Sequence, residues 1–360
     1  MRRPSIKDVA AQSGVSFQTV SKVLNGGGSV SRTTRRAILD AADQLGYLPD
    51  ASARGLVTRR TQLLGVVVGD LADETLARFV VAVEREAKRL GYALAIVSVG
   101  AETAEAAETA ETGETGEASQ GMRHLPETTI NEQSVLALLE RRVDGILLAA
   151  PQLEEDDQLG RLLTENVPVV SLHSVPGGVA SLIGSDHVEV GRLATQHLLD
   201  HGHRRIGVVA GPSSRRVSSA RLRGHRAVME AQAGDVENDL VEQGDWSPAG
   251  GAAATRRLLA RRPDITALAV HNDLMAIGVL EALHDLGRPA PAGVAVVSVD
   301  NIPVAAHTIP PLTTVAIPFE ETGSVAAATL VDLVEGRAVP ERRHIPVSLR
   351  VRRSCGDHCA

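Results

Sequence analysis

The chain has 360 residues, of which 43% are hydrophobic, a length that allows two or three domains with substantial cores. It contains no run of about eighteen apolar residues and no apolar stretch at its N-terminus, which disfavours membrane insertion and export. The two cysteines, Cys355 and Cys359, both lie near the end of the chain, so no disulfide framework is expected and the cytoplasm is the expected compartment.

Charge is distributed unevenly along the chain. Residues 1–60 contain ten Lys and Arg against four Asp, a net charge of +6, so the remaining residues must carry −13 to give the total of −7. A basic first segment on an acidic body indicates a nucleic-acid partner for the first segment alone.

Residues 5–24 predict two short helices separated by a sharp turn. Ser5 and Asp8 are spaced as a variant of the capping box, Ser16 can cap the second helix, and Gly14 provides the turn. Apolar residues at helical spacing give each helix a buried face: Ile6, Val9 and Ala10 in the first, and Val20, Val23 and Leu24 in the second. This spacing predicts a helix-turn-helix unit.

A third helix is expected to begin after Ser31, its cap, and to end at Gly46. Four apolar residues form its predicted buried stripe: Ile38, Leu39, Ala42 and Leu45. The three helices together predict an all-α head over residues 1–48.

The outer face of the second helix carries side chains suited to reading DNA. Gln18 and Lys22 are four residues apart and share one face, where a Gln amide can read adenine and a Lys can read guanine. Phe17 faces outward with them, and short polar residues that can hold phosphates complete the predicted contact set: Ser16, Thr19, Ser21, Asn25 and Ser31. Three-helix units with this spacing also occur in proteins that do not bind DNA.

Residues 1–60 resemble the LacI/GalR family of transcriptional repressors, in the stretches DVAAQSGVSFQTVSKVLN and VSRTTRRAILDAADQLGYLPDASARGL. The resemblance implies a linker over residues 49–61 whose short helix enters the minor groove, where Leu56 wedges into a central base step beside Ala53 and Arg54. An isolated helix this short is marginal in water, so we expect it to fold only with DNA and a partner chain.

Beyond residue 62, apolar runs typical of buried strands alternate with amphipathic stretches. Strands are expected at 63–70, 92–99, 144–150, 167–173, 180–186, 204–211, 265–273, 294–301, 313–319 and near 345–351. Helices are expected at 75–90, 131–141, 154–165, 187–202, 218–233, 248–262, 274–287 and 320–336. The alternation predicts an α/β body of two lobes, each a doubly wound parallel sheet.

The first predicted lobe spans about 62–186 plus 319–344 and the second about 187–316 plus 345–353, followed by a tail at 354–360. Residues 101–121 interrupt the alternation with an acidic tract that repeats Glu at every third position. Because such a tract lacks large apolar residues, it predicts a disordered surface insert.

The body, residues 62–353, resembles the ligand-binding part of the same family, which is similar to periplasmic sugar-binding proteins. The matching stretches are GHRRIGVVAGP, SARLRGHR, GDW, HNDLMAIGVLEAL and VAVVSVDNIPVAAHTIPPLTTV. Among family members, GDW and SARLRGHR look nearest to the lactose-type repressors.

Polar side chains that follow strands form the predicted effector site, because ligands of open α/β sheets bind beyond the carboxyl ends of the strands. Arg221 can donate two hydrogen bonds to neighbouring hydroxyls, and Asn272 and Asp300 supply acceptors. Each of these residues could instead have a purely structural role: Asp300 could cap a turn, Arg221 could pair with an acid on the next helix, and Trp246 could lie in the core.

The resemblance adds further effector positions. It implies that Trp246 packs on the apolar face of a sugar and that Phe319 forms another apolar wall. Asp70 ends the first strand, and His173 stands where lactose-type repressors carry an acid, so the sugar recognised is expected to differ.

The function that the resemblance implies is a dimeric repressor that a mono- or disaccharide releases from a near-palindromic operator in double-stranded DNA. One alternative has the opposite coupling between ligand and DNA, in which a co-repressor such as a purine strengthens operator binding. Another is an enzyme or a sugar-binding protein without regulatory role, although the chain has no P-loop, GxGxxG, GxSxG or HExxH motif. No cofactor is expected, and Cys355, His358 and Cys359 lack a second half-site for a metal.

Overall fold

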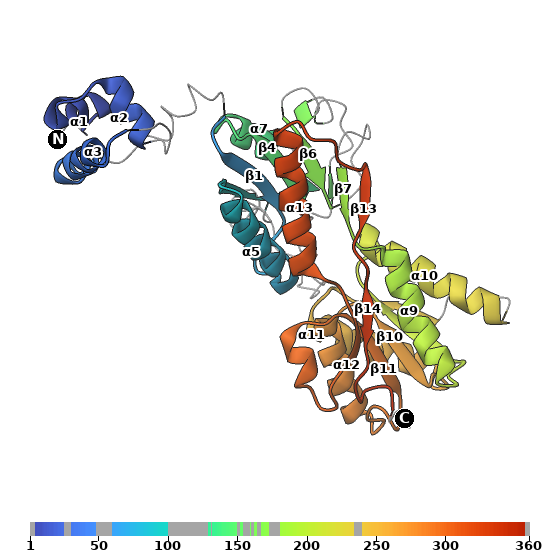
Figure 1. The fold of residues 1–360 in the computed structure, drawn as a ribbon. Coiled ribbons are helices and arrows are strands. Elements are labelled where there is room, and N and C mark those ends of the chain that lie inside the picture. The colour runs from blue at the N-terminus through green and yellow to red at the C-terminus, as the bar shows by residue number, and fades with distance from the viewer. Residues whose placement is uncertain are drawn as a thin grey trace, which may run out of the picture. The chain divides into compact units, whose positions relative to one another are not determined.

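The computed structural model describes residues 4–24, 30–47, 60–99, 129–130, 132–149, 152–153, 159, 162–163, 167–172, 181–233 and 240–356. Contacts divide the chain into two compact units, Met1–Leu63 and Leu64–Ala360 (Figure 1). Several predictions lie outside the described residues: those on Asn25, Ala53, Arg54, Leu56, His173, the acidic insert 101–121 and residues 357–360, together with most of the helix expected at 154–165. None of the described helices is long and apolar enough to cross a membrane.

The first unit contains the three predicted helices, α1 (Ile6–Ser13), α2 (Phe17–Leu24) and α3 (Arg32–Leu45). The turn between α1 and α2 is made by Gly14, whose φ of +68° lies in the left-handed region that favours glycine. The backbone N–H of Ser5 donates to Asp8 Oδ2 at 2.8 Å, as the capping pattern predicts, and Ser31 accepts from the Thr34 N–H at 3.1 Å.

Buried residues from all three helices form the core of this unit: Val9, Val20, Val23, Ile38, Ala41 and Ala42. The prediction of a buried Leu39 was wrong, since its side chain is 49% exposed and Ala41 is buried instead. Ile38, Ala41, Ala42 and Leu45 are spaced three and four residues apart and share one helix face, whereas Leu39 lies about 100° around the helix from Ile38.

Within its described residues, the second unit contains two six-stranded sheets, which confirms the predicted fold class. The sheet of the first lobe has the order β13-β7-β6-β4-β1-β2, and that of the second lobe β14-β12-β11-β10-β8-β9. Strand β4 pairs parallel with β1 and β6, β10 pairs parallel with β8 and β11, and β14 runs antiparallel to β12.

The elements of the first lobe are β1 (Leu63–Val68), α5 (Glu74–Arg89), β2 (Ala93–Ser98), α7 (Glu132–Leu139), β4 (Gly145–Ala149), β6 (Val169–Ser171), β7 (Ser181–Gly184), α13 (Phe319–Val334) and β13 (Arg342–His344). Two short strands, β3 (Thr129–Ile130) and β5 (Gln152–Leu153), pair with each other. The core includes Leu64, Val66, Phe79, Leu147 and Leu330, contributed by strands and by both α5 and α13.

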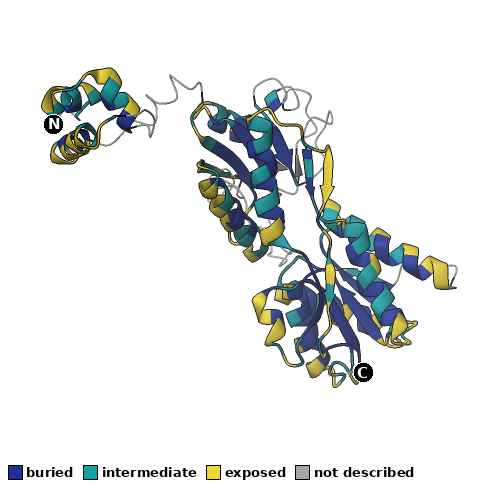
Figure 2. Cartoon of the chain, in the orientation of Figure 1, coloured by how far each residue is buried: buried dark blue, intermediate teal, exposed yellow. Residues whose placement is uncertain are grey.

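The elements of the second lobe are α9 (His187–Asp200), β8 (Ile206–Ala210), α10 (Arg216–Ala233), β9 (Val241–Gln243), α11 (Pro248–Arg261), β10 (Ala267–Val270), α12 (Asp273–Asp285), β11 (Ala295–Asp300), the 3-10 turn η2 (Pro303–Ala306), β12 (Thr313–Ala316) and β14 (Ser348–Arg350). Its sheet packs on two separate apolar clusters, one with α11 and α12 and one with α9 and α10. Figure 2 shows the central strands β8, β10, β11 and β12 buried and much of the outer helix surface exposed.

Three short segments connect the lobes, between β7 and α9, between β12 and α13, and between β13 and β14. Because β7 and β12 each enter the other lobe after their last residue, the carboxyl ends of the parallel strands in both sheets lie toward the lobe junction (Figure 1). This is the edge at which a ligand of an open α/β sheet is expected.

Three expected strands have different limits in the structure. The strand expected at 265–273 ends at Val270, because Asn272 caps α12, and Phe319 begins α13 instead of ending a strand. The strand expected near 345–351 is β14 alone, and β13 before it was not anticipated. Ser354 and Cys355 are buried in the second lobe, where the Ser354 hydroxyl donates to the Val296 carbonyl at 2.6 Å, so they are not part of a free tail.

Candidate functional site: a DNA-reading helix and a polar cluster at the lobe junction

Helix α2 exposes the residues predicted to read DNA. Gln18 and Lys22 are both exposed, and Phe17 is 48% exposed on the same helix, whose Val20 and Val23 are buried. This division follows from the sequence, because the apolar residues Val20, Val23 and Leu24 pack against α1 and α3 while the polar residues face outward.

The short polar residues around α2 cap and brace the helix. Ser16 Oγ accepts from the Thr19 N–H at 3.2 Å and lies 2.9 Å from the Thr19 hydroxyl, while Ser31 does the same for the N-terminus of α3. Ser21 is half-buried. Hydroxyls and backbone N–H groups at the N-termini of these two helices are of the kind that hold phosphates.

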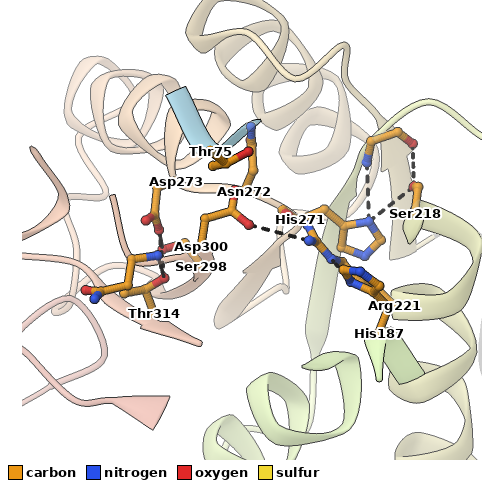
Figure 3. A network of polar contacts seen from close by, with 12 residues as sticks. Thr75, His187, Ser218, Arg221, His271, Asn272, Asp273, Ser298, Asp300 and Thr314 are labelled. Carbon is orange, nitrogen blue, oxygen red and sulfur yellow. Dashed lines mark hydrogen bonds and ion pairs between the residues drawn. The ribbon is translucent and has the colours of Figure 1, made fainter. Parts of the chain in front are cut away.

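In the second unit, Arg221 is the centre of a buried polar cluster (Figure 3). Its side chain is 5% exposed and projects from α10 toward the ends of β10 and β11. Its guanidinium donates to the His271 carbonyl, to Asp300 Oδ1 at 3.4 Å and, through Nε, to His187 Nδ1 at 3.4 Å. Arg221 therefore joins three elements of the second lobe at one point.

Trp246 packs beside Arg221. The Arg221 Cζ lies 5.8 Å from the centroid of the indole ring, a cation–π distance. Gly211, directly after β8, lies against the same ring, since a Cβ at this position would be 2.2 Å from Trp246 Cζ2. Trp246 has a φ of +71°, a backbone conformation that non-glycine residues rarely adopt and that occurs preferentially at functional sites.

Asn272 and Asp300 complete the predicted polar set at the strand ends. Asn272 Oδ1 caps α12 by accepting from the Met275 N–H at 2.9 Å, and its Nδ2 donates to the Trp246 carbonyl at 3.1 Å. Asp300 has a φ of +109° at the end of β11. The structure thus brings Arg221, Trp246, Asn272 and Asp300 together, and we call these four residues the Arg221 cluster.

Burial and neighbouring charges act in opposite directions on the ion pair. Burial raises the pKa of Asp300 well above its usual value, while Arg221 opposes the shift and Asp273 and Asp73 add to it. Burial lowers the pKa of Arg221, and the same carboxylates oppose that shift. Each side chain therefore favours the charged form of the other, against the burial that disfavours both charges.

Asp273 ties the strand ends together behind the cluster (Figure 3). Its Oδ1 accepts from the hydroxyls of Ser298 and of Thr314, the latter at 2.8 Å, and its Oδ2 accepts from the Ile302 N–H at 2.8 Å. These bonds link α12 to β11 and β12, and so fix the backbone from which Asn272 and Asp300 project.

Two other predicted effector residues lie in different settings. Asp70 is exposed, and its Oδ1 accepts from the Ala72 N–H at 2.8 Å. Phe319 is partly buried and packs against apolar clusters of both lobes, at the start of α13. Neither contacts Arg221 directly in the described hydrogen bonds.

Sequence reasoning missed His271, Ser218 and His187. His271 Nδ1 accepts from the Gly211 N–H at 3.3 Å and lies 3.3 Å from the Ser218 hydroxyl, which itself donates to the Gly211 carbonyl at 2.7 Å. Burial and Arg221 hold the pKa of His271 well below its usual value, so its ring is neutral. The sequence signal that could have identified His271 is its position directly before Asn272 at a strand end.

His197 of α9 lies beside a buried cysteine of the second lobe. Its Nε2 lies 3.2 Å from the buried Cys355 Sγ, a contact between α9 and the chain after β14. Within the part of the chain that the structure describes, no group of three or more His, Cys, Asp or Glu side chains is arranged to hold a metal ion.

Comparisons with known proteins cover both units. A model of the lacI family of bacterial regulatory proteins matches residues 5–50, and a model of a periplasmic binding protein-like domain matches residues 195–355. The HTH-type transcriptional regulator CelR of Thermobifida fusca is 36% identical over 358 residues, which are 98% of each chain.

The solved structures that cover nearly the whole chain include two with bound ligands. The lac repressor dimer bound to operator and the anti-inducer ONPF has a TM-score of 0.81 at 29% identity and covers 99% of this chain and 100% of that one. The complex of transcriptional regulator CelR with cellobiose has a TM-score of 0.67 at 34% identity and covers 98% of this chain and 100% of that one. The chain belongs to the lacI family of bacterial DNA-binding transcriptional regulators.

Proposed function

We propose that this protein is a cytoplasmic, dimeric repressor that a sugar releases from its operator. The observation that carries the proposal is the Arg221 cluster: a buried guanidinium, a carboxylate, an amide and an indole gathered at the carboxyl ends of the second-lobe strands. Such a set can bind neighbouring hydroxyls bidentately and pack an aromatic face against the apolar side of a pyranose ring.

Helix α2 supports the DNA-binding part of the proposal. Gln18 and Lys22 are exposed on one helix face. They are about one helical turn apart, so both side chains can reach neighbouring base edges in the major groove. The linker 49–61, with Leu56 as a minor-groove wedge beside Ala53 and Arg54, belongs to the same proposal, and so do Asn25 in the head and His173 in the effector site. A lac repressor relative is a dimer on operator DNA, which supports the two-fold arrangement.

Exposed apolar side chains support dimerisation. On the first lobe Val81 of α5 and Ile96 of the edge strand β2 are exposed, and on the second lobe Val304 and Ile309 are exposed in the segment after β11. Large apolar side chains at these positions are consistent with faces that a second copy covers.

The test is a sugar screen followed by an operator titration. Thermal shift of the full-length protein with common mono- and disaccharides, including cellobiose because a CelR relative binds it, should identify a ligand. The Arg221→Lys variant keeps a cation but loses the bidentate fork, so it should abolish the shift while the head still binds operator. If the ligand raised the melting temperature of Arg221→Lys as much as that of the wild type, the ligand site would lie elsewhere.

A second candidate function has the opposite coupling, in which a non-sugar ligand such as a purine strengthens operator binding. The indole of Trp246 beside Arg221 favours it, because an aromatic ring and a guanidinium also suit a flat heteroaromatic base. Titrating operator affinity with hypoxanthine or guanine distinguishes the two candidates.

A further inference from the structure

Asp73, a residue of the first lobe that the sequence pattern did not single out, lies at the same junction as the Arg221 cluster. It follows β1 and caps α5, where its Oδ1 accepts from the Thr75 N–H at 2.8 Å and from the Thr75 hydroxyl at 2.6 Å. Because the carboxyl ends of both sheets lie toward the junction, Asp73 is on the first-lobe edge that faces the second-lobe strand ends. Figure 3 shows Thr75 in the same close view as Asn272 and Asp300.

The charge of Asp73 acts across the junction. It raises the pKa of Arg221 and also raises the pKa of Asp300, although burial is the larger influence on both groups. Asp73 is itself exposed, so solvent and dissolved salt weaken this influence and make it depend on ionic strength. The hydrogen bonds to Thr75 and the N-terminus of α5 hold the carboxylate in this place.

Among the described residues that interact with this ion pair, carboxylates outnumber guanidinium groups. Arg221 is paired with Asp300, and Asp73 and Asp273 both add negative charge near that pair. The guanidinium of Arg352 interacts with Asp273 from behind the strand ends, where it donates to Asn301 Oδ1 at 2.7 Å and to the Leu312 carbonyl. An anionic ligand would therefore meet a cation that is already neutralised and two further carboxylates.

We propose that Asp73 is a charge filter, which makes the Arg221 cluster select an uncharged, hydroxyl-rich effector and reject phosphorylated or carboxylated sugars. Hydroxyls can donate to the free lone pairs of Asp73 and Asp300, so the same carboxylates that repel an anion bind a neutral polyol. This inference rests on the proposed function, because it concerns the ligand of the same site.

The test compares ligand pairs that differ in charge: glucose with glucose 6-phosphate, ribose with ribose 5-phosphate, and cellobiose with cellobionate. Calorimetric titration of the full-length protein should give a preference for the neutral member of the bound pair of at least about tenfold, and the preference should shrink with added salt. In Asp73→Asn the preference should fall by about tenfold, while α5 stays capped because Asn is an equally good capping residue.

Glu74→Gln is the matched control, since it removes the same charge from the next residue, which is exposed on the first turn of α5. This variant should retain the wild-type preference. Equal binding of both members of a pair by the wild type, or an unchanged preference in Asp73→Asn, would overturn the charge filter and leave the proposed function intact. Binding of no ligand of either kind would overturn the proposed function and the filter with it.

Discussion

The buried His225 predicts a specific loss of stability in acid. His225 on α10 is 2% exposed, and its Nδ1 lies 2.9 Å from Thr195 Oγ1 on α9. The Thr195 hydroxyl donates to the Gly191 carbonyl at 2.8 Å, so the Nδ1–H of His225 is the donor in the bond between them. His225 Nε2 is then a bare lone pair, buried without a hydrogen-bond partner among the described residues.

Protonation of Nε2 would bury an unpaired charge between two helices that pack closely, since a Cβ at Gly224 would lie 2.0 Å from the Val188 carbonyl oxygen. Burial accordingly lowers the pKa of His225 from 6.5 to about 4, with a smaller contribution from Arg226. Because the unfolded chain binds this proton below its pKa of 6.5 and the folded chain does not until about 4, folding is progressively destabilised as the pH falls through that window.

The size of the destabilisation follows from the lowered pKa of His225. At about 1.4 kcal/mol per pKa unit, His225 should cost about 2 kcal/mol of unfolding free energy at about pH 5 and about 3 kcal/mol at about pH 4, relative to neutral pH. Urea unfolding of wild type and His225→Asn, followed by circular dichroism across this range, measures the difference. Asn keeps a donor for Thr195 and does not titrate, so its free energy of unfolding should fall less steeply with acid.

The pH slope, not the absolute stability, is the readout, because Asn also leaves a small cavity that lowers stability at every pH. His284→Asn on the exposed face of α12 is the control and should follow the wild-type slope. Identical slopes for wild type and His225→Asn between about pH 7 and pH 4 would refute the account of a buried neutral imidazole.

Three further predictions concern the two binding functions. Gln18→Ala should relax the base preference at one operator position by about 1–3 kcal/mol, measured by anisotropy against operators with each base at each position, and equal losses at every position would contradict the assigned face. Leu56→Ala should weaken specific operator binding while ligand binding stays unchanged, and an unaltered operator affinity would exclude the wedge. Gly211→Ala would place its Cβ 2.2 Å from the Trp246 ring, so calorimetry should show about tenfold or greater loss of effector affinity with operator binding retained. Undiminished effector affinity in that variant would mean that Trp246 does not contact the ligand.

The sequence predicts the elements well where one periodicity dominates. The α1–α3 head and the alternating strands and helices of the second lobe follow from apolar spacing, and Gly14 and Gly46 mark helix ends. In the Arg221 cluster, Arg221, Asn272 and Asp300 follow from their positions after strands, whereas Trp246 was implied by the family resemblance. Strand ends were less predictable, because an apolar run such as 265–271 does not show where the cap residue Asn272 takes over.

Other parts of the site depend on tertiary contacts that local patterns do not contain. His271 and Ser218 are far apart in sequence and meet only because β10 and α10 lie at the same edge of one sheet. Asp73 reads locally as a helix cap, and its electrostatic role appears only when the first lobe is placed against the second. Leu39 was misplaced because a hydrophobic residue next to a buried stripe is indistinguishable from a member of it until the partner helices are known.

The central claim is that a ligand at the Arg221 cluster and operator DNA at the head are energetically coupled. The direct measurement is operator affinity with and without a saturating sugar found in the screen, together with sugar affinity with and without operator. Thermodynamic linkage requires that sugar change operator affinity by the same factor as operator changes sugar affinity. We expect each of the two affinities to fall by about 5- to 150-fold when the other ligand is bound. An operator affinity that no ligand changes, or a protein that binds no double-stranded DNA sequence specifically, would contradict it.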